Sequence, residues 1–293
     1  MRLLSWNIQS TKGCDGVFNR HRIIDVIRKF GELDVICLQE VSRNIQAYND
    51  DDQKQLFEQA FAGYHSVWAT GFSRPLGNGK SQEFGNLTLV KQGKLLDQRI
   101  HQLPVPCVLP ALQIPRTLAE TVILYKNTTI NLLNTHLAYH SESESIQQIE
   151  HLTRLRDQIL SHTEPSAIFK EPSATDKKPS TLKHNQDAYH LAKRGQHVLL
   201  CGDLNVDLNS AKYTKMTSEM AWLDTAEIAL KNTHSSQRQP TCGVFDTDLW
   251  PDGAHVRDYF LCSSGLHDQI ANIEVNTFTM ASDHQPICIT LKD

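Results

Sequence analysis

Short apolar runs alternate along this chain with stretches that carry apolar residues on one helical face. Runs of four to eight apolar and β-branched residues predict strands, and recurrence every three or four residues predicts helices. The predicted helices cover 20–30, 53–61 and 141–159. The predicted strands cover 2–6, 34–38, 64–69, 84–90, 118–125, 129–134, 197–201, 255–262, 270–277 and 285–291.

Local signals support several of these boundaries. Ser141 and Glu144 have the spacing of a capping box, so the third helix is expected to begin there. Lys126–Asn127 is expected to form a hairpin turn between two strands. Residues 163–183 are rich in Pro, Ser, Thr and Lys, and the strand signal resumes only at His197. We therefore expect a single α/β domain over 1–293, with a surface loop inserted at 163–196.

The amino-acid composition and the net charge argue against several classes of protein. Hydrophobic residues make up 40% of the 293 residues, which is enough for a large core. No stretch approaches the roughly 20 apolar residues that a membrane span needs, and the first residues lack the pattern of a signal peptide. The net charge of −4 gives no overall electrostatic footprint for nucleic acid.

The seven cysteines are odd in number, scattered, and without CxxC spacing. This pattern favours free thiols over a disulfide framework or a zinc site, so a cytoplasmic location is expected. No heptad run is present, and a monomer is the default expectation.

Polar residues stand where apolar strands begin or end, at six places. Residues at strand ends are held by a rigid scaffold and remain open to solvent. A polar turn explains one such position more easily than six. The residues are Asn7, Glu40, His136, the pair Asp203 and Asn205, Asp258, and the pair Asp283 and His284.

Three of these places suggest specific chemistry. Asp203 and Asn205 are two apart and would point to one face of an extended backbone, although the sequence GDLN is equally typical of a turn. Asp283 beside His284 offers a metal ligand and an acid/base in one turn. Asp258 is either an edge-strand acid or the carboxylate that orients a histidine.

Oxygen-rich ligands without paired thiols favour a hard cation, Mg²⁺ or Mn²⁺. Such ligands, with histidines as proton carriers, fit the hydrolysis of a phosphate ester.

In this order, the strand-end motifs resemble those of the endonuclease/exonuclease/phosphatase superfamily, which is deoxyribonuclease I-like. The matching stretches run from Asn7 to His284, nearly the whole chain. The resemblance implies a four-layer sandwich, with two mixed β-sheets face to face and helices outside. The stretches are SWNIQ, DVICLQEV, QEFGNLTLV, PRTLAE, NTHLAYH, CGDLNVD, VRDYFL and SDHQPI.

The resemblance also implies a role for each residue. Glu40 would be the principal metal ligand, with Asn7 and Asp283 around the same ion or the phosphate. His284 would activate water and Asp258 would orient it. Asp203 and Asn205 would contact the scissile phosphate, the water or a second metal. His136 would stabilise the phosphate or protonate the leaving group, Glu83 would pair with His136, and Arg116 would contact the phosphate.

At two positions this chain departs from motifs of the superfamily, and these differences limit which of its branches the chain resembles. Many nucleases of the superfamily carry an acid two residues after the first Asn, where this chain has Gln9. Exonuclease III-type enzymes carry a tyrosine at the position of His136, which disfavours abasic-site repair.

The leading hypothesis is a metal-dependent phosphodiesterase or nuclease, with a phosphate ester as substrate and nucleic acid as one candidate. The alternative is a phosphatase or phospholipase C-like hydrolase acting on a small phosphorylated or lipid headgroup substrate. A third hypothesis, a catalytically silent binding module, is disfavoured because the strand-end acids and histidines are all present.

Overall fold

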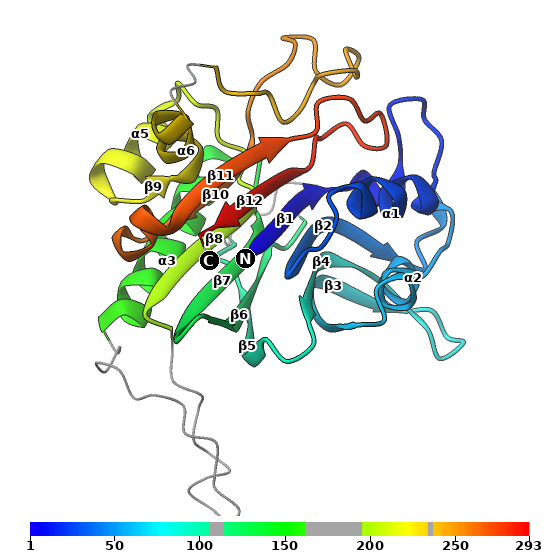
Figure 1. The fold of residues 1–293 in the computed structure, drawn as a ribbon. Helices are drawn as coiled ribbons and strands as arrows, with labels where there is room; N and C mark the ends of the chain where they lie inside the picture. The colour runs from blue at the N-terminus through cyan, green and yellow to red at the C-terminus, as the bar shows by residue number, and fades with distance from the viewer. Residues whose placement is uncertain (106–113, 162–194, 234–236, 293) are drawn as a thin grey trace, which may run out of the picture.

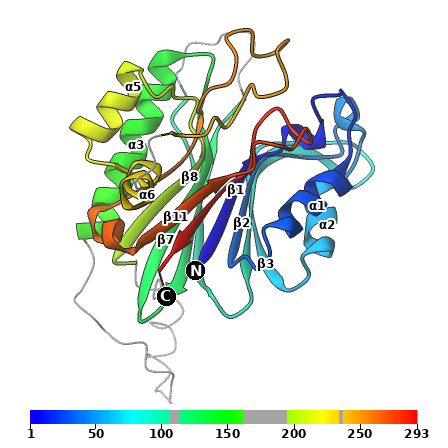
Figure 2. The ribbon, with the colours of Figure 1, turned by 45° about the horizontal axis from the view of Figure 1, so that its top comes forward.

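Two six-stranded β-sheets pack face to face, with helices on their outer faces (Figures 1 and 2). This arrangement, seen in a computed structural model, confirms the expected sandwich. The structure describes residues 1–105, 114–161, 195–233 and 237–292. The expected insertion at 163–196 lies almost entirely outside the described residues.

The first sheet has the order β11-β12-β1-β2-β4-β3. Its central strands β1 and β2 are parallel and are connected through helix α1, whereas all its other pairs are antiparallel. Its strands are β1 (Arg2–Asn7), β2 (Val35–Arg43), β3 (Tyr64–Pro75), β4 (Ser81–Lys91), β11 (Ile270–Val275) and β12 (Ile287–Leu291).

The second sheet has the order β5-β6-β7-β8-β10-β9. It also contains one parallel pair, β7 with β8, and its other pairs are antiparallel. Its strands are β5 (Leu95–Gln102), β6 (Thr117–Tyr125), β7 (Thr128–His136), β8 (His197–Asp203), β9 (Leu223–Asp224) and β10 (Asp258–Cys262).

Helices cover both outer faces. Helix α1 (Arg20–Lys29) and α2 (Gln53–Ala60) lie on the first sheet, and α3 (Glu142–Ser161) lies on the second. Helix α6 (Thr225–Thr233) packs against β10 and β11. Shorter helical turns are η1 (Gln9–Thr11), η2 (Gln46–Tyr48), α5 (Ala211–Thr214), η3 (Lys215–Glu219) and η4 (Ser264–Gln269).

The predicted helix starts have clear causes. The Asn19 side chain caps α1 by accepting hydrogen bonds from the backbone N–H groups of His21 and Arg22. Ser141 caps α3, since its Oγ accepts from the Glu144 N–H at 3.3 Å. The Glu144 carboxylate accepts from Gln148 at 3.0 Å.

All ten predicted strands are present, with shifted ends. The strand predicted from residue 255 begins at Asp258, the one predicted from residue 285 begins at Ile287, and the one predicted to reach residue 277 ends at Val275. Strands β5 and β9 were not predicted, because the β5 sequence LLDQRIHQ is mostly polar and β9 has only two residues. The hairpin turn at Lys126–Asn127 is confirmed between β6 and β7.

The space between the sheets changes from apolar at one end to polar at the other. Side chains alternate along a strand, so every second residue faces this space. In β1 the sequence of facing residues is Leu3, Ser5 and Asn7, and in β8 it is Leu199, Cys201 and Asp203. The same change occurs along β2 and β7. The predicted site residues therefore converge at one end of the sandwich.

No helix among the described residues is long and apolar enough to cross a membrane. The six described cysteines, which exclude Cys107, are all free thiols, as expected.

Candidate active site

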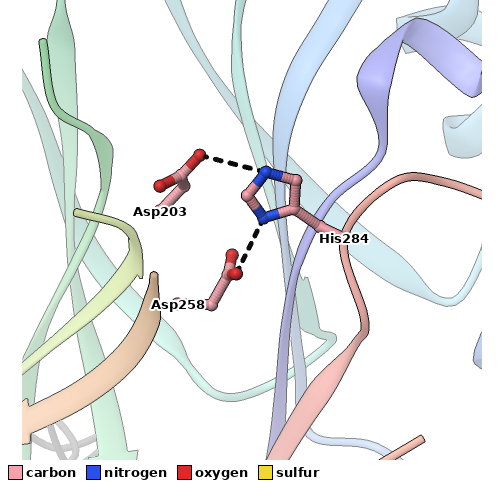
Figure 3. Close-up of side chains that lie close together, drawn as sticks. All are labelled: Asp203, Asp258 and His284. Carbon is pink, nitrogen blue, oxygen red and sulfur yellow. Dashed lines mark hydrogen bonds and ion pairs between the residues drawn. The ribbon is translucent and has the colours of Figure 1, made fainter. Parts of the chain in front are cut away.

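Asp203, Asp258 and His284 meet at the polar end of the space between the sheets (Figure 3). Antiparallel pairing of β8 with β10 places Asp203 opposite Asp258, and His284 reaches them from the loop before β12. The Nδ1 of His284 lies 2.8 Å from Asp258 Oδ2, and its Nε2 lies 3.6 Å from Asp203 Oδ2. The Trp6 indole donates to the backbone oxygen of His284 at 2.9 Å and fixes the loop.

This geometry gives His284 the character of a base. Burial alone would lower the pKa of the ring, but the surrounding carboxylates, with Asp258 foremost, raise it well above its ordinary value. Because Asp258 occupies Nδ1, Nε2 is the nitrogen available for proton transfer.

Glu40 reaches the same space because β2 contains a bulge. Gln39 and Glu40 together face the single residue Asn86 on β4, and Glu40 has a left-handed backbone with φ of 55°. A bulge re-aims side chains, and both residues now serve the same end of the sandwich. Regular alternation would have turned Glu40 to the outer face.

Asn7 connects the carboxylates of the two sheets. Its Nδ2 donates to Glu40 Oε1 at 3.1 Å and to Asp203 Oδ2 at 3.0 Å. Its Oδ1 accepts from the Gln9 N–H at 3.1 Å. Asn7 therefore presents its amide nitrogen to the carboxylates and holds them together. Its expected role as a metal ligand stays a prediction.

Glu40 and Asp283 form a pair of like charges. Burial, followed by the charge of Asp283, raises the pKa of Glu40 to about 7. Asp283 Oδ2 accepts a hydrogen bond from the Trp250 indole at 3.3 Å. Neighbouring carboxylates whose ionisation is disfavoured are stabilised by a cation placed between them.

Asn205 follows β8 in a left-handed conformation with φ of 50°, and its N–H donates to Asp203 Oδ1 at 3.0 Å. The GDLN sequence thus forms a turn, and this turn brings Asp203 and Asn205 together at the polar end of the space between the sheets. Gly202 is required here, because a Cβ on it would lie 1.8 Å from the Thr135 carbonyl oxygen on β7.

His136 ends β7 and is buried against this turn. Its Nε2 lies 3.1 Å from Asn205 Nδ2 and 3.3 Å from Asp203 Oδ2, and its Nδ1 lies 3.7 Å from Glu40 Oε1. Burial and then the charge of Arg116 lower the pKa of His136 to about 3. A ring that stays neutral at pH 7 donates a hydrogen bond more readily than it transfers a proton, which favours phosphate stabilisation over leaving-group protonation.

Arg116 lies directly before β6, with 3% of its surface exposed. Burial lowers the pKa of its guanidinium, and the charges of Glu40 and Asp203 partly offset this. Among the described residues, neither its Nε nor its Nη2 has a hydrogen-bond partner. A buried cation with free donors is suited to an anionic ligand.

The expected pairing of Glu83 with His136 is wrong. The Glu83 carboxylate accepts hydrogen bonds from Arg43 at 2.5 Å, Trp68 at 3.1 Å and Ser73 at 3.1 Å. The register of β2 with β4 sets Glu83 opposite Arg43, beyond the bulge at Glu40. A catalytic role for Glu83 therefore has no geometric support.

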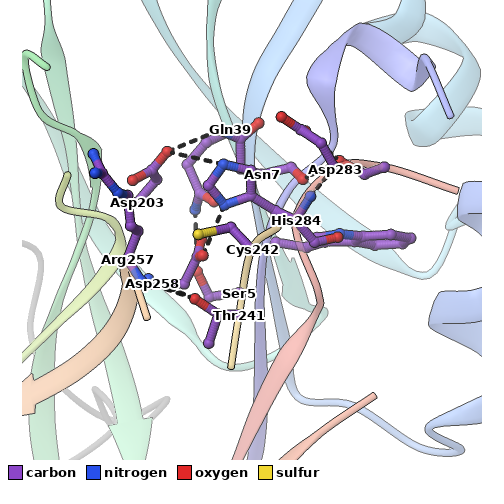
Figure 4. A network of polar contacts seen from close by, with 12 residues as sticks. Ser5, Asn7, Gln39, Asp203, Thr241, Cys242, Arg257, Asp258, Asp283 and His284 are labelled. Atoms are coloured by element: carbon purple, nitrogen blue, oxygen red, sulfur yellow. Dashed lines mark hydrogen bonds and ion pairs between the residues drawn. The ribbon is translucent and has the colours of Figure 1, made fainter. Parts of the chain in front are cut away.

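Three features of the site were not among the predicted site residues, and Figure 4 labels Arg257, Gln39 and Ser5 from two of them. Arg257 donates to Asn205 Oδ1 at 3.2 Å, and the Trp250 ring packs edge-on against His284 with ring centroids 5.7 Å apart. Beneath the acids, a buried layer of neutral polar residues joins the sheets, with Gln39 donating to Ser5 and Asn134. Arg257 adjoins the predicted Asp258, and that adjacency was the only signal in the sequence.

The residues present fit a divalent cation. Carboxylate oxygens from Glu40, Asp283 and Asp203 suit a hard ion. Among the described residues, Asp203, Asp258 and His284 each bring one candidate ligand atom within 4.8 Å of the others. However, the Asp258–His284 hydrogen bond already occupies two of those groups, so the side containing Glu40 and Asp283 is the better candidate position.

This combination of sandwich, strand-end acids and paired histidines defines a class of hydrolase. The chain belongs to the Endonuclease/Exonuclease/phosphatase family, whose family model matches residues 4–284. Members of this family hydrolyse phosphate esters.

Solved structures share the fold at low identity. An endonuclease/exonuclease/phosphatase from Beutenbergia cavernae aligns with a TM-score of 0.68 and 18% identity, covering 100% of this chain and 72% of that one. A mannosyl-6-phosphatase from Bacteroides thetaiotaomicron aligns with a TM-score of 0.65 and 16% identity, covering 100% of both chains. Truncated TDP2 from Caenorhabditis elegans aligns at 0.59 and 18%, covering 100% and 97%. No curated protein sequence matches the chain.

Proposed function

We propose that this protein is a divalent-metal-dependent phosphodiesterase in which His284 accepts a proton from the attacking water. The observation that carries the proposal is the Asp258–His284 hydrogen bond of 2.8 Å beside Asp203. It fixes the ring, raises its basicity and leaves Nε2 directed at the site.

The phosphate would lie between two sets of donors and the base. Within the described part of the chain, the Nε and Nη2 of Arg116 and the Nδ1 of His136 have no hydrogen-bond partner. Both belong to a buried surface, where hydrogen bonds to a phosphoryl oxygen are stronger than in water. Developing negative charge is thereby stabilised while His284 holds the proton from water.

The acids would hold the cation. Glu40 and Asp283 are the proposed ligands, with Asp203 at the edge of the same space and Asn7 holding Glu40 and Asp203 by hydrogen bonds. A bound Mg²⁺ or Mn²⁺ would neutralise charge on the phosphoryl and leaving oxygens.

A phosphomonoesterase is the second candidate function. The support is the mannosyl-6-phosphatase that aligns over its full length and that of this chain. Among the described residues, the site offers one buried arginine with unpartnered donors, Arg116, and the additional charge of a monoester would favour further cations. This difference favours the diester.

The test compares bis-(p-nitrophenyl) phosphate with p-nitrophenyl phosphate, each with Mg²⁺, Mn²⁺ or EDTA. Metal-dependent cleavage of the diester by wild type, lost in His284→Ala with the fold retained, is the expected result. Preference for the monoester would put the phosphatase first. No cleavage of either ester or of oligonucleotides, together with no metal binding by calorimetry, would overturn the proposal.

A further inference from the structure

Arg257 differs from Arg116, because each of its three nitrogens already has a partner. Its Nη1 donates to Asn205 Oδ1 at 3.2 Å and its Nε to His255 Nε2 at 3.0 Å, while its Nη2 lies 3.3 Å from Asp207 Oδ1. The Trp250 ring lies 5.1 Å from its guanidinium carbon. Arg116 in contrast has free donors. Arg257 is therefore placed to hold its neighbours rather than to bind substrate.

The partners of Asn205 determine which way its amide faces. Arginine has only donors, so the amide atom facing Arg257 must be the oxygen. The amide nitrogen then donates to the Leu137 carbonyl oxygen at 3.0 Å, which has only lone pairs to offer. Two independent contacts thus fix one orientation.

This orientation selects the tautomer of His136. The second amide hydrogen of Asn205 points at His136 Nε2, 3.1 Å away, so that nitrogen must accept and the proton must lie on Nδ1. Asp203 Oδ2, 3.3 Å from the same Nε2, favours the opposite tautomer. The balance between the two tautomers depends on how firmly the amide is held.

We propose that Arg257 is a positioning residue that orients the Asn205 amide and thereby keeps the His136 proton on Nδ1, directed at the phosphate position. The link to turnover rests on the proposed function, whereas the link to the tautomer does not. Loss of Arg257 removes one of the two contacts that orient the amide, and Asp203 then draws the proton to Nε2.

Two readouts on the full chain test this. In Arg257→Met, ¹⁵N NMR of His136, assigned with His136→Gln, should show the proton moving from Nδ1 toward Nε2. On bis-(p-nitrophenyl) phosphate, kcat should fall about 10- to 100-fold, the range for residues that orient a functional group, with KM nearly unchanged. Arg257→Lys, which can donate to one acceptor at a time, should restore part of kcat.

The matched control is Arg156→Met. Arg156 also lies over a tryptophan, with its guanidinium carbon 4.6 Å from the Trp222 ring. It donates to the Met220 carbonyl and the Asp157 carboxylate, and both of these partners lie outside the site. Its substitution should leave kcat and the His136 tautomer unchanged.

The decisive comparison is made in the Asn205→Ala background, where Arg257→Met should have no further effect on kcat. The proposal would be overturned if Arg257→Met lowered kcat further in the Asn205→Ala background. It would also be overturned if the His136 tautomer did not shift, or if Arg156→Met lowered kcat equally. A wild type that hydrolyses no phosphate ester, but shows the expected tautomer and its shift, would refute the proposed function and leave the positioning role standing.

Discussion

Gln39 on β2 donates a hydrogen bond to Asn134 Oδ1 on β7 at 2.7 Å, across the space between the two sheets. Gln39 also donates to Ser5 Oγ, and Asn134 donates to Thr88 Oγ1, all within the buried interior. This neutral layer separates the apolar core from the charged site above it. It positions the ends of β1, β2 and β7, from which Asn7, Glu40 and His136 extend.

Replacement of Gln39 by Met should therefore destabilise the fold. It leaves the buried Asn134 oxygen without its donor, at a cost of roughly 1–3 kcal/mol. Chemical denaturation should show this fall in unfolding free energy. The double variant Gln39→Met/Asn134→Leu should recover part of the loss, because the Asn134 oxygen is then removed together with its donor. The recovery is only partial, since Ser5 and Thr88 each lose a hydrogen bond as well. Simple addition of the two losses would show that the hydrogen bond contributes nothing specific.

Replacement of Glu40 by Gln should abolish metal binding while leaving the fold intact. The glutamine side chain is uncharged but keeps an oxygen that can accept the hydrogen bond from Asn7 Nδ2. Isothermal calorimetry with Mg²⁺ or Mn²⁺ should show a loss greater than the roughly 100-fold typical of residues that only orient a ligand. Glu83→Gln is the matched control, since its carboxylate is bound by Arg43 and Trp68. Equal losses in both variants would contradict the assignment.

Metal affinity should depend on pH through Glu40. Its pKa of about 7 means that the carboxyl is protonated below that pH in the metal-free protein. A cation must displace this proton, so affinity should fall about tenfold per pH unit below 7. Titrations at pH 5.5, 6.5 and 8 measure the slope. A flat profile would mean that Glu40 does not hold the ion.

The raised pKa of Glu40 also predicts how the stability of the metal-free fold depends on pH. Metal affinity should rise with pH, whereas this stability should fall. The folded pKa of Glu40 lies above its ordinary 4.5, so the neutral form stabilises the metal-free fold. That contribution is complete below pH 4.5 and is lost as the pH rises through about 7. Thermal unfolding in EDTA should therefore show wild type weakening over this interval relative to Glu40→Gln. Saturating metal should remove the difference.

Replacement of Arg116 by Met should weaken substrate binding. Its buried Nε and Nη2, which have no partner among the described residues, would donate to the phosphate in the proposed complex, and such hydrogen bonds to a charged group contribute about 1.5–3 kcal/mol. Steady-state kinetics should show kcat/KM falling about 10- to 100-fold, together with weaker inhibition by inorganic phosphate. Lysine at this position should restore the charge but not the paired donors. Unaltered phosphate inhibition would remove Arg116 from the site.

The strand-end residues could be predicted because they depend on local pattern. Asn7, His136 and Asp203 each continue the inward-facing series of a strand, so alternation places them correctly. The position of Glu40 does not follow from alternation along the strand. Alternation assigns Gln39 and Glu40 to opposite faces, and only the bulge opposite Asn86 brings both to the site.

The features that the sequence did not predict correctly depend mostly on contacts between segments far apart in the chain. Glu83 was misplaced because its partner is set by the register of β2 with β4, which the sequence does not display. Arg257 and Trp250 belong to an irregular segment with no periodicity. Strand β5 was missed because it is a largely polar edge strand, where exposure replaces the apolar signal.

The position of β1 between β2 and β12 has a consequence for the timing of folding. Asp283 and His284 are the last site residues to leave the ribosome, and β12 pairs with the first strand only after them. A nascent chain can bury much of its second sheet earlier, since β5 to β10 are contiguous in sequence. It nevertheless lacks the proposed base and part of the proposed cation site until then, so the proposed site can be completed only after β1 to β11 have been synthesised.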